Sequence, residues 1–449
     1  MNMAKRDGFG SSFGVLVAMA GSAVGLGNLW RFPYLVGTNG GAAFIIIYLF
    51  FVLLLALPIM YAEFIIGRRS QANVFGAYKV LAPGTGWRYV GIIFLLASVT
   101  IISFYSVVGG WTMDYFLKAL ALKFDTPDTA VLGQMFGNVV SSNVEPVLFM
   151  LIFLFATAFI LLSGVKAGIE KYAKIMMPLL FLIVLFIAVR SVTLPGAGAG
   201  LEFLFKPDFS KVTAGTFLAA LGQAFFSLSV GAGTIMTYAS YVSKKESIVG
   251  LSVQTALSDT LFAIIAGLAI MPAVFAFGIS PSEGPGLVFV TLPNIFAQLP
   301  FGYILAIIFF FALFIAAITS SISMMEVIVA YLNEEFGVSR KWSVLLTTAV
   351  IAAFGTLCSL SQGTLKEFTI FGNNIFDCFD KLSANILLPL GGLSAVIFVG
   401  WRMTKAECTD ELTSSGTRNY PAFFINFIYL SIKYLAPVVV AVVLAQGLL

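Results

Sequence analysis

The sequence contains no histidine, and its three cysteines, Cys358, Cys378 and Cys408, form no CxxC pair. The ligands of a zinc site and the residues for histidine-based catalysis are therefore missing. No clustered nucleophile or paired-carboxylate motif is present either, which disfavours an integral-membrane enzyme. Charged residues make up only 10% of the chain, whereas a soluble domain contains about 25%. So few charges cannot cover a water-exposed surface, which excludes an ordinary soluble protein.

Hydrophobic residues are abundant instead and make up 59% of the 449 residues. They occur in long runs without the alternation of a β-barrel, and a membrane span requires about 20 apolar residues. The sequence therefore predicts an all-α polytopic membrane protein with eleven transmembrane helices. The spans are expected near residues 12–36, 41–67, 89–117, 147–163, 172–191, 215–240, 249–277, 301–332, 343–360, 379–401 and 422–446.

Lysine and arginine are distributed asymmetrically between the two sides of this bundle. With the N-terminal MNMAKRDGF inside, sixteen of the 25 basic residues lie in cytoplasmic segments and seven in outer segments. This bias predicts a protein of the cytoplasmic membrane with a cytoplasmic N-terminus and, after eleven spans, an external C-terminus. The connection 278–300 has no Lys or Arg and is expected to form a re-entrant or capping loop. The basic residues form no single stripe, so the lipid bilayer and not nucleic acid is the expected partner.

The first and sixth spans are interrupted near their centres by small residues. They read MAGSAVGLGNLWRFP and FFSLSVGAGTIMTYASY. Paired interruptions in corresponding halves indicate the midplane site of an inverted-repeat transporter. Glycine allows the backbone to leave the helix, so that carbonyl groups turn toward a cation and half-helix N-termini face a carboxylate. The alternative is that these glycines only permit close helix packing.

Polar and charged side chains accompany these interruptions at membrane depth. A charged group at the bilayer centre costs about 2.5 to 3.5 kcal/mol, so it usually faces a partner or a cavity. Asp259 is the strongest candidate, with a structural pair as its alternative, and for Thr319 and Ser320 the alternative is a bond to a carbonyl one turn back. Clustered hydroxyl, amide, carbonyl and carboxylate oxygens favour Na⁺ over a transition metal. The polar groups are Asn28, Arg31, Glu63, Gln223, Ser227, Asp259 and the run 319–321.

Five motifs together resemble the neurotransmitter:sodium symporters, which have the leucine-transporter fold. They are MAGSAVGLGNLWRFP, YAEFIIGR, SFYSVVGGW, FFSLSVG and ITSSIS, and the resemblance covers residues 6–402. It implies two inverted five-helix repeats around a central site, with helices 1–5 in residues 1–195 and helices 6–10 in residues 196–402. Residues 403–449 would then form a cytoplasmic loop and helix 11. Most relatives have twelve spans, and the shortening to eleven is known among bacterial members.

The resemblance also implies two Na⁺ sites beside a substrate site, and no organic cofactor. The first site (Na1) would use the Ala23 carbonyl, Asn28, Ser227 and Asp259, completed by the substrate carboxylate. The second site (Na2) would use the carbonyls of Gly21, Val24 and Ala316 and the hydroxyls of Thr319 and Ser320. Substrate-lining residues would be Ser22, Ala23, Leu26, Gly27, Ile101, Tyr105, Phe226, Ser227, Ser229, Ala232, Ser320 and Met324.

Two gates follow from the same resemblance. The outer gate would be an ion pair of Arg31 and Asp380 beside Gln223, above an aromatic lid of Tyr105 and Phe226. The inner gate would pair Arg6 with Glu334, near Phe9 and Tyr241. Because exposed pairs contribute little, the inner pair is alternatively only a solvated contact between loops.

Three departures from the family pattern refine the expected substrate. Asp259 replaces the Asn of most members and supplies a fixed negative charge, so transport is expected to be independent of chloride. Gly25 replaces the Asp that binds the ligand amine in monoamine carriers, which favours an α-amino acid. Ala232 replaces a bulky aromatic, which leaves room for Trp, Tyr, Phe, Leu or Met.

The chain is therefore predicted to be a sodium-coupled symporter that imports hydrophobic or aromatic L-amino acids by alternating access. Two alternatives remain open. Asp259 and Glu63 are titratable, so proton coupling is possible. An ion channel with the glycine breaks as its filter is less favoured, because filters are usually symmetric rings of repeated loops, and the sequence has no such motif.

Overall fold

A computed structural model describes residues 8–278 and 286–447, and these residues form helices and connecting turns without a β-strand. The helices of the first half are α1 Ser12–Ala23, α2 Phe32–Thr38, α3 Ala42–Phe51, α4 Leu57–Ser70, α5 Val74–Leu81, α6 Val90–Leu120, α7 Thr129–Ser141, α8 Glu145–Leu162, α9 Lys171–Val192 and α10 Gly198–Phe205. Those of the second half are α11 Ala214–Ser227, α12 Thr234–Ala239, α13 Ile248–Ala276, α14 Leu292–Gln298, α15 Gly302–Phe336, α16 Arg340–Leu360, α17 Ile375–Leu382, α18 Leu388–Ile397, α19 Lys405–Leu412, α20 Ala422–Leu430 and α21 Ala436–Gly447.

The predicted all-α membrane bundle is confirmed. Within the described residues, nine continuous helical stretches are long and apolar enough to cross a membrane, and one further pair of helices is bent by 51° at a break. That pair is the first predicted span, Ser12–Ala23 with Gly27–Thr38. The sixth predicted span consists of α11 and the short α12, and the count of eleven is consistent with these elements. In the connection 278–300, residues 279–285 lie outside the described part, and α14 occupies its second half.

Several spans contain a widened π-helical turn directly before a proline. Proline has no N–H, and its ring clashes with the carbonyl group four residues earlier, so the preceding turn widens to relieve the clash. Each turn ends two residues before the proline, at Pro33, Pro58, Pro293 and Pro389. The prolines therefore lie within helical stretches without ending them.

The polarity of the bundle is inverted relative to that of a soluble protein. Leu182 and Val189 on α9 are 65% and 55% exposed, whereas Asn28, Glu63 and Asp259 are 0% exposed. An apolar exterior suits hydrocarbon, and buried polar groups in such a bundle indicate a site or a pathway.

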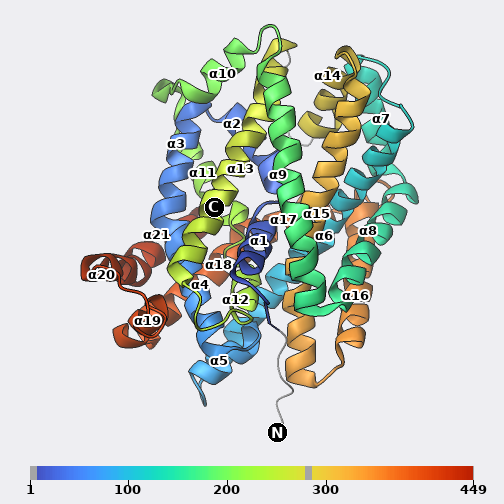
Figure 1. Ribbon diagram of the computed structural model, residues 1–449. Coiled ribbons are helices and arrows are strands. Elements are labelled where there is room, and N and C mark those ends of the chain that lie inside the picture. The colour runs from blue at the N-terminus through green and yellow to red at the C-terminus, as the bar shows by residue number, and fades with distance from the viewer. Residues whose placement is uncertain (1–7, 279–285, 448–449) are drawn as a thin grey trace.

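The short helices lie at the two ends of the bundle. In Figure 1, α7, α10 and α14 gather at one end, and α5 and α19 lie at the opposite end. We call these the α14 end and the α19 end. The two broken spans lie between them, in the interior.

Candidate functional site

The first span is interrupted between Ala23 and Gly27. Val24 leaves the helix with φ −71° and ψ 106°, and a π turn over Gly27–Arg31 restarts it. A Cβ atom on Gly25 would lie 2.5 Å from Ser320 Oγ and 3.0 Å from Tyr105 OH. Position 25 therefore has no space for a side chain, which explains why it cannot carry the Asp of the monoamine carriers.

The second interruption covers residues 228–233, between α11 and α12. Three residues there adopt positive φ: Ser229 at 53°, Gly231 at 83° and Gly233 at 81°. The backbone N–H of Gly231 donates to Glu63 Oε1 at 2.6 Å, and Ser98 Oγ donates to the carbonyl of Ala232 at 2.8 Å. Side chains from α4 and α6 thus satisfy the backbone groups that the break exposes.

A compact polar cluster surrounds Asp259 beside both breaks. Asn28 Nδ2 donates to Asp259 Oδ1 at 2.7 Å. Ser227 Oγ and Tyr48 OH donate to Asp259 Oδ2 at 2.7 and 3.2 Å. The carboxylate thus accepts hydrogen bonds from three buried side chains on three other helical segments, and its full burial makes these partners necessary.

Two members of this neighbourhood were missed by the sequence interpretation. Tyr48 contacts the carboxylate of Asp259 directly, but an isolated Tyr in an apolar span carries no signal of that role. Thr255 lies one helical turn before Asp259 on the same helix, and its buried hydroxyl has no hydrogen-bond partner. The spacing of four residues was the available signal, because such residues share a helix face.

The oxygen atoms expected to form the Na2 site lie in two groups, one around Ser320 and one around Thr319. Ser320 Oγ lies 3.4 Å from the Gly21 carbonyl oxygen and 3.5 Å from that of Val24. Thr319 Oγ1 lies 3.1 Å from the Ala316 carbonyl oxygen. Thr319 also bonds the Ile315 carbonyl at 3.2 Å, so the bond to a carbonyl one turn back, the alternative for this residue, is present as well.

A small central cavity of about 20 Å³ lies between the two breaks. Every residue expected to line the substrate site borders it except Leu26. Gly25 and Leu388, which were not predicted, border it too. Leu26 instead faces a second cavity toward α7. Its N–H nevertheless donates to Tyr105 OH at 3.2 Å, so Leu26 stays adjacent to the expected lid.

The second cavity is a vestibule of about 480 Å³ that shares Gly27, Tyr105 and Phe226 with the central cavity. Arg31 and Asp380 both line it, but within the described residues no ion pair joins them. Arg31 lies instead over the Phe226 ring, with Cζ 4.7 Å from its centroid. The outer gate residues Arg31 and Asp380 thus line one vestibule without forming an ion pair.

Gln223 does not line the vestibule. It is 0% exposed, and neither its amide nitrogen nor its amide oxygen has a hydrogen-bond partner. The predicted gate role of Gln223 therefore has no contact to support it in this conformation.

Between the central cavity and the α19 end, the segment before α1 packs against neighbouring elements. The N–H of Phe9 donates to the Tyr241 carbonyl at 3.4 Å, and the Phe9 ring centroid lies 5.7 Å from that of Tyr238. Tyr241 OH donates to Glu326 Oε1 at 2.8 Å, and Arg340 holds both oxygens of Glu326 at 3.1 and 2.7 Å. This ion pair, in which the Glu326 carboxylate is buried, was not predicted.

Of the predicted inner pair, only Glu334 lies within the described residues, and Arg6 lies outside them. Glu334 Oε2 accepts from the backbone N–H and the side chain of Asn73, at 2.8 and 3.1 Å. This carboxylate is therefore anchored to the turn between α4 and α5.

Comparisons with known proteins agree with this architecture. The profile of the sodium:neurotransmitter symporter family matches residues 6–127 and 129–449. The sodium-dependent transporter YhdH of Bacillus subtilis is 39% identical over 433 residues, which is 96% of each chain. A sodium-dependent transporter of Haemophilus influenzae is 37% identical over 458 residues, covering 100% of this chain and 99% of its own.

Among solved structures, the crystal structure of MhsT in complex with L-phenylalanine is similar to this chain. The TM-score is 0.91, the identity is 42%, and the alignment covers 98% of this chain and 100% of that one. The predicted resemblance is thereby confirmed, and the profile match extends it beyond residue 402. The protein is a multi-pass membrane transporter with the leucine-transporter fold. The chain belongs to the sodium:neurotransmitter symporter family.

Proposed function

We propose that the protein is a sodium-coupled symporter that imports a hydrophobic or aromatic L-amino acid by alternating access. One observation carries the proposal: Ser227, which donates to Asp259, and Ser320, which lies near the Gly21 and Val24 carbonyl oxygens, border the same central cavity. Hard oxygen ligands suit Na⁺, and an amino acid between them would contact both ion sites. Na⁺ is then a co-substrate that crosses the membrane with the ligand.

The first ion site uses Asp259, Asn28, Ser227 and the Ala23 carbonyl, and the ligand carboxylate completes it. Thr255, with its unpartnered buried hydroxyl one turn away, is a further candidate ligand. The second site uses the oxygens of Gly21, Val24, Ala316, Thr319 and Ser320. Two ions are thus coupled to one ligand, and only the first site needs that ligand to be complete.

The ligand preference follows from the lining of the central cavity. Ile101, Phe226, Ala232, Met324 and Leu388 provide apolar surface, and the crowded Gly25 leaves no carboxylate for a ligand amine. The structure of MhsT, similar over nearly the whole chain, contains L-phenylalanine. A hydrophobic side chain on an α-amino acid suits this apolar lining.

Transport is proposed to be independent of chloride. Three donors, Asn28, Ser227 and Tyr48, converge on the Asp259 carboxylate. A resident carboxylate supplies the negative charge that balances Na⁺, so these donors need no mobile anion.

The orientation of the bundle defines the direction of transport. The segments predicted to be cytoplasmic hold sixteen of the Lys and Arg residues, and basic loops remain inside. These segments include α5 and α19, so we assign the α19 end to the cytoplasm. The open vestibule then faces outward, and the contacts of Phe9 and Tyr241 close the inner side. Na⁺ binding favours this outward-facing state, and the ligand allows the lid of Tyr105 and Phe226 to close.

The membrane potential supplies part of the driving force. Each inward Na⁺ gains about 2.3 kcal/mol per 100 mV. Two ions can therefore sustain a steep gradient of a neutral amino acid without any bond chemistry.

The test is uptake of radiolabelled L-phenylalanine and L-leucine by reconstituted protein, with Na⁺ replaced by K⁺ or choline. We expect saturable uptake in Na⁺ and none above background in the other two media. Equal uptake in all three media would contradict the proposal.

Proton coupling is a second candidate, because Glu63 Oε2 is buried without a hydrogen-bond partner. A protonated carboxyl would tolerate that position better than a carboxylate. Dissipating the pH gradient while holding the Na⁺ gradient discriminates between the two, since only a proton-coupled carrier loses uptake.

A further inference from the structure

The most deeply buried arginine of the described bundle lies outside the transport pathway. Arg68, near the end of α4, is 1% exposed, and its Nε donates to Oε2 of Glu411 on α19, which is 3% exposed, at 2.8 Å. The same guanidinium donates to the carbonyl oxygen of Glu411, to the carbonyl oxygen of Glu246 at 2.5 Å and to Ser414 Oγ at 3.3 Å. Burial of this charge is tolerated only because each of its three nitrogens donates to an oxygen.

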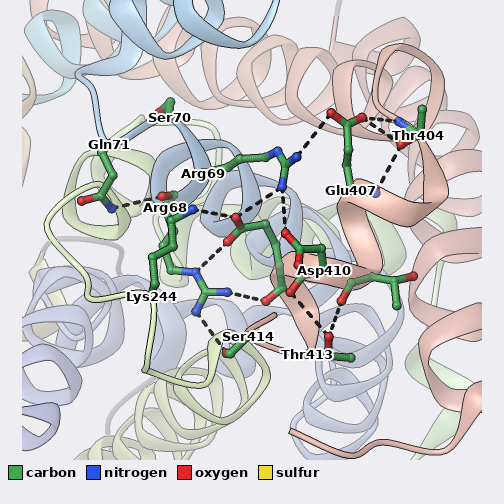
Figure 2. Close-up of polar contacts among 12 residues, drawn as sticks. Arg68, Arg69, Ser70, Gln71, Lys244, Thr404, Glu407, Asp410, Thr413 and Ser414 are labelled. Carbon is green, nitrogen blue, oxygen red and sulfur yellow. Dashed lines mark hydrogen bonds and ion pairs between the residues drawn. The ribbon is translucent and has the colours of Figure 1, made fainter. Parts of the chain in front are cut away.

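Lys244 adds a second cation to the same carboxylate, with Nζ 2.8 Å from Glu411 Oε1. We call Arg68, Lys244, Glu411 and Ser414 the docking cluster. Figure 2 shows Arg68 and Arg69 directed toward the segment that carries Asp410 and Ser414, with Lys244 beside them. Arg69 pairs at the rim with Glu407 and Asp410, whose side chains are 40% and 46% exposed, and reaches Glu411 Oε1 only at 3.6 Å. Such half-exposed pairs contribute little.

The loop between α12 and α13 is held from two sides through its backbone. Arg68 and Ser414 both donate to the Glu246 carbonyl oxygen, Ser414 at 2.8 Å. Directly after α4, Gln71 Nε2 donates to the Val242 carbonyl at 3.2 Å. The position of Glu246 therefore depends on α4 and on the turn that follows α19.

The side chain of Glu246 points to a different element. Its Oε1 accepts from Ser12 Oγ at 2.6 Å, and Ser12 is the first residue of α1, the inner half of the first broken span. Polar contacts therefore run continuously from α19 through Glu246 to α1. Unlike the docking cluster, the bond between Ser12 and Glu246 is exposed to solvent, so it can break without leaving a buried charge unpaired.

We propose that α19 sets the closed position of α1: its buried contacts hold the Glu246 backbone, and the Glu246 carboxylate then holds the start of α1 through Ser12. The inference rests on the proposed function, in which α1 leaves its closed position to release Na⁺ inward. Loosening α19 then shifts the population toward the inward-open state. Since Na⁺ favours the outward-facing state, the shift weakens apparent Na⁺ affinity.

The chain provides its own probe of α19 docking. Cys408 lies on the buried face of α19, 1% exposed, with Sγ 3.7 Å from the Val399 carbonyl oxygen. Burial raises the pKa of its thiol to about 12. Undocking would expose the thiol and restore its usual pKa, and both changes increase its reactivity, because the thiolate is the nucleophile.

The experiment uses the full-length reconstituted protein with the partly exposed Cys378 replaced by serine. Alkylation of Cys408 by N-ethylmaleimide reports docking, and alkylation of Cys358, buried in α16, reports unfolding of the bundle. Equilibrium binding of radioactive sodium gives the apparent affinity without depending on the identity of the amino acid. The variants are Arg68→Gln, Ser414→Ala and Ser12→Ala, with Arg69→Gln as the matched control.

Each variant has a distinct expected result. Arg68→Gln accelerates alkylation of Cys408 by on the order of tenfold or more and weakens Na⁺ binding, because it breaks a buried pair. Ser414→Ala is a small truncation that the fold can accommodate. It also accelerates alkylation of Cys408 and weakens Na⁺ binding, each by about fivefold. Ser12→Ala weakens Na⁺ binding by about threefold but leaves Cys408 protected, because it removes the contact between Glu246 and α1 and leaves the contacts of α19 intact. Arg69→Gln changes neither readout.

Two outcomes overturn the proposal. One is protection of Cys408 in both Arg68→Gln and Ser414→Ala with Cys358 also unreactive. The other is exposure of Cys408 with unchanged Na⁺ binding, which would disconnect α19 from α1. Both differ from a failure of the proposed function, in which the unaltered protein would bind no sodium at all.

Discussion

Ser229 Oγ donates a hydrogen bond to the carbonyl oxygen of Ser22 at 3.0 Å. This contact joins the two chain breaks directly, because Ser22 precedes the first break and Ser229 lies in the second. Ser229 has a φ of 53°, an uncommon backbone conformation that its surroundings must maintain. The two half-helix ends are thereby held against one cavity, an arrangement that both proposed ion sites require.

Replacing Asp259 tests the first ion site. Asp259→Ala should abolish Na⁺-stimulated uptake, because it removes a charged oxygen ligand and leaves three buried donors unpaired. Uptake as a function of Na⁺ concentration is the measurement. A sodium response like that of the unaltered protein would refute the assignment.

Chloride dependence provides an independent test of the same carboxylate. Uptake by the unaltered protein should be equal in chloride and gluconate media. Asp259→Ser should make the residual uptake chloride-dependent, because Asn28 and Tyr48 would then face a site without an anion. A collapse of uptake in gluconate with Asp259 present would exclude the resident-charge explanation.

The second ion site is tested at Ser320. Ser320→Ala removes a hydroxyl that lies near two carbonyl oxygens, and we expect the Na⁺ concentration for half-maximal uptake to rise about tenfold. Ser321→Ala is the control, because the neighbouring Ser321 hydroxyl has no hydrogen-bond partner and its loss should have little effect. Equal responses of the two variants would remove Ser320 from the site.

Ala232 is expected to control the ligand size. Ala232→Phe fills part of the central cavity and should shift preference toward smaller apolar amino acids, by about 1 to 3 kcal/mol per methylene lost from the ligand. The measurement is the rank order of unlabelled amino acids as inhibitors of L-phenylalanine uptake. Ala232→Ser, which keeps the small size, should preserve the original order. An unchanged order in Ala232→Phe would place the side-chain pocket elsewhere.

Gly25 is expected to be required for its lack of a side chain. In Gly25→Ala the new Cβ would meet Ser320 Oγ at 2.5 Å and Tyr105 OH at 3.0 Å, so an ion ligand and the lid must both shift. Uptake should fall by about tenfold or more. Gly222→Ala is the control, since a Cβ there meets no atom within 4 Å. Normal uptake by Gly25→Ala would contradict the crowding of this break.

Much of the architecture was predictable because membrane helices are specified locally in the chain. About 20 apolar residues are required wherever a helix crosses hydrocarbon, so each of the eleven predicted ranges coincides with helical structure. The glycines of the first and sixth spans likewise identified the breaks, since few other residues tolerate the backbone conformations of Gly231 and Gly233.

The contacts between segments distant in sequence could not be derived in this way. Leu26 was expected in the central cavity but faces the vestibule, because the direction of a side chain at a helix break depends on the local backbone conformation. Arg31 and Asp380 were expected to pair, yet they line the same vestibule without an ion pair among the described residues. Whether two such side chains pair depends on how the helices that carry them pack, and residue type alone does not specify that.

By itself, the sequence determined that this chain is a helical membrane protein with two broken spans and oxygen-bearing side chains at their level, because hydropathy and glycine act locally. Only the tertiary structure decided that Tyr48 reaches Asp259 and that Arg68 is buried against Glu411. These pairs are 211 and 343 residues apart in sequence, and helix packing alone brings them into contact.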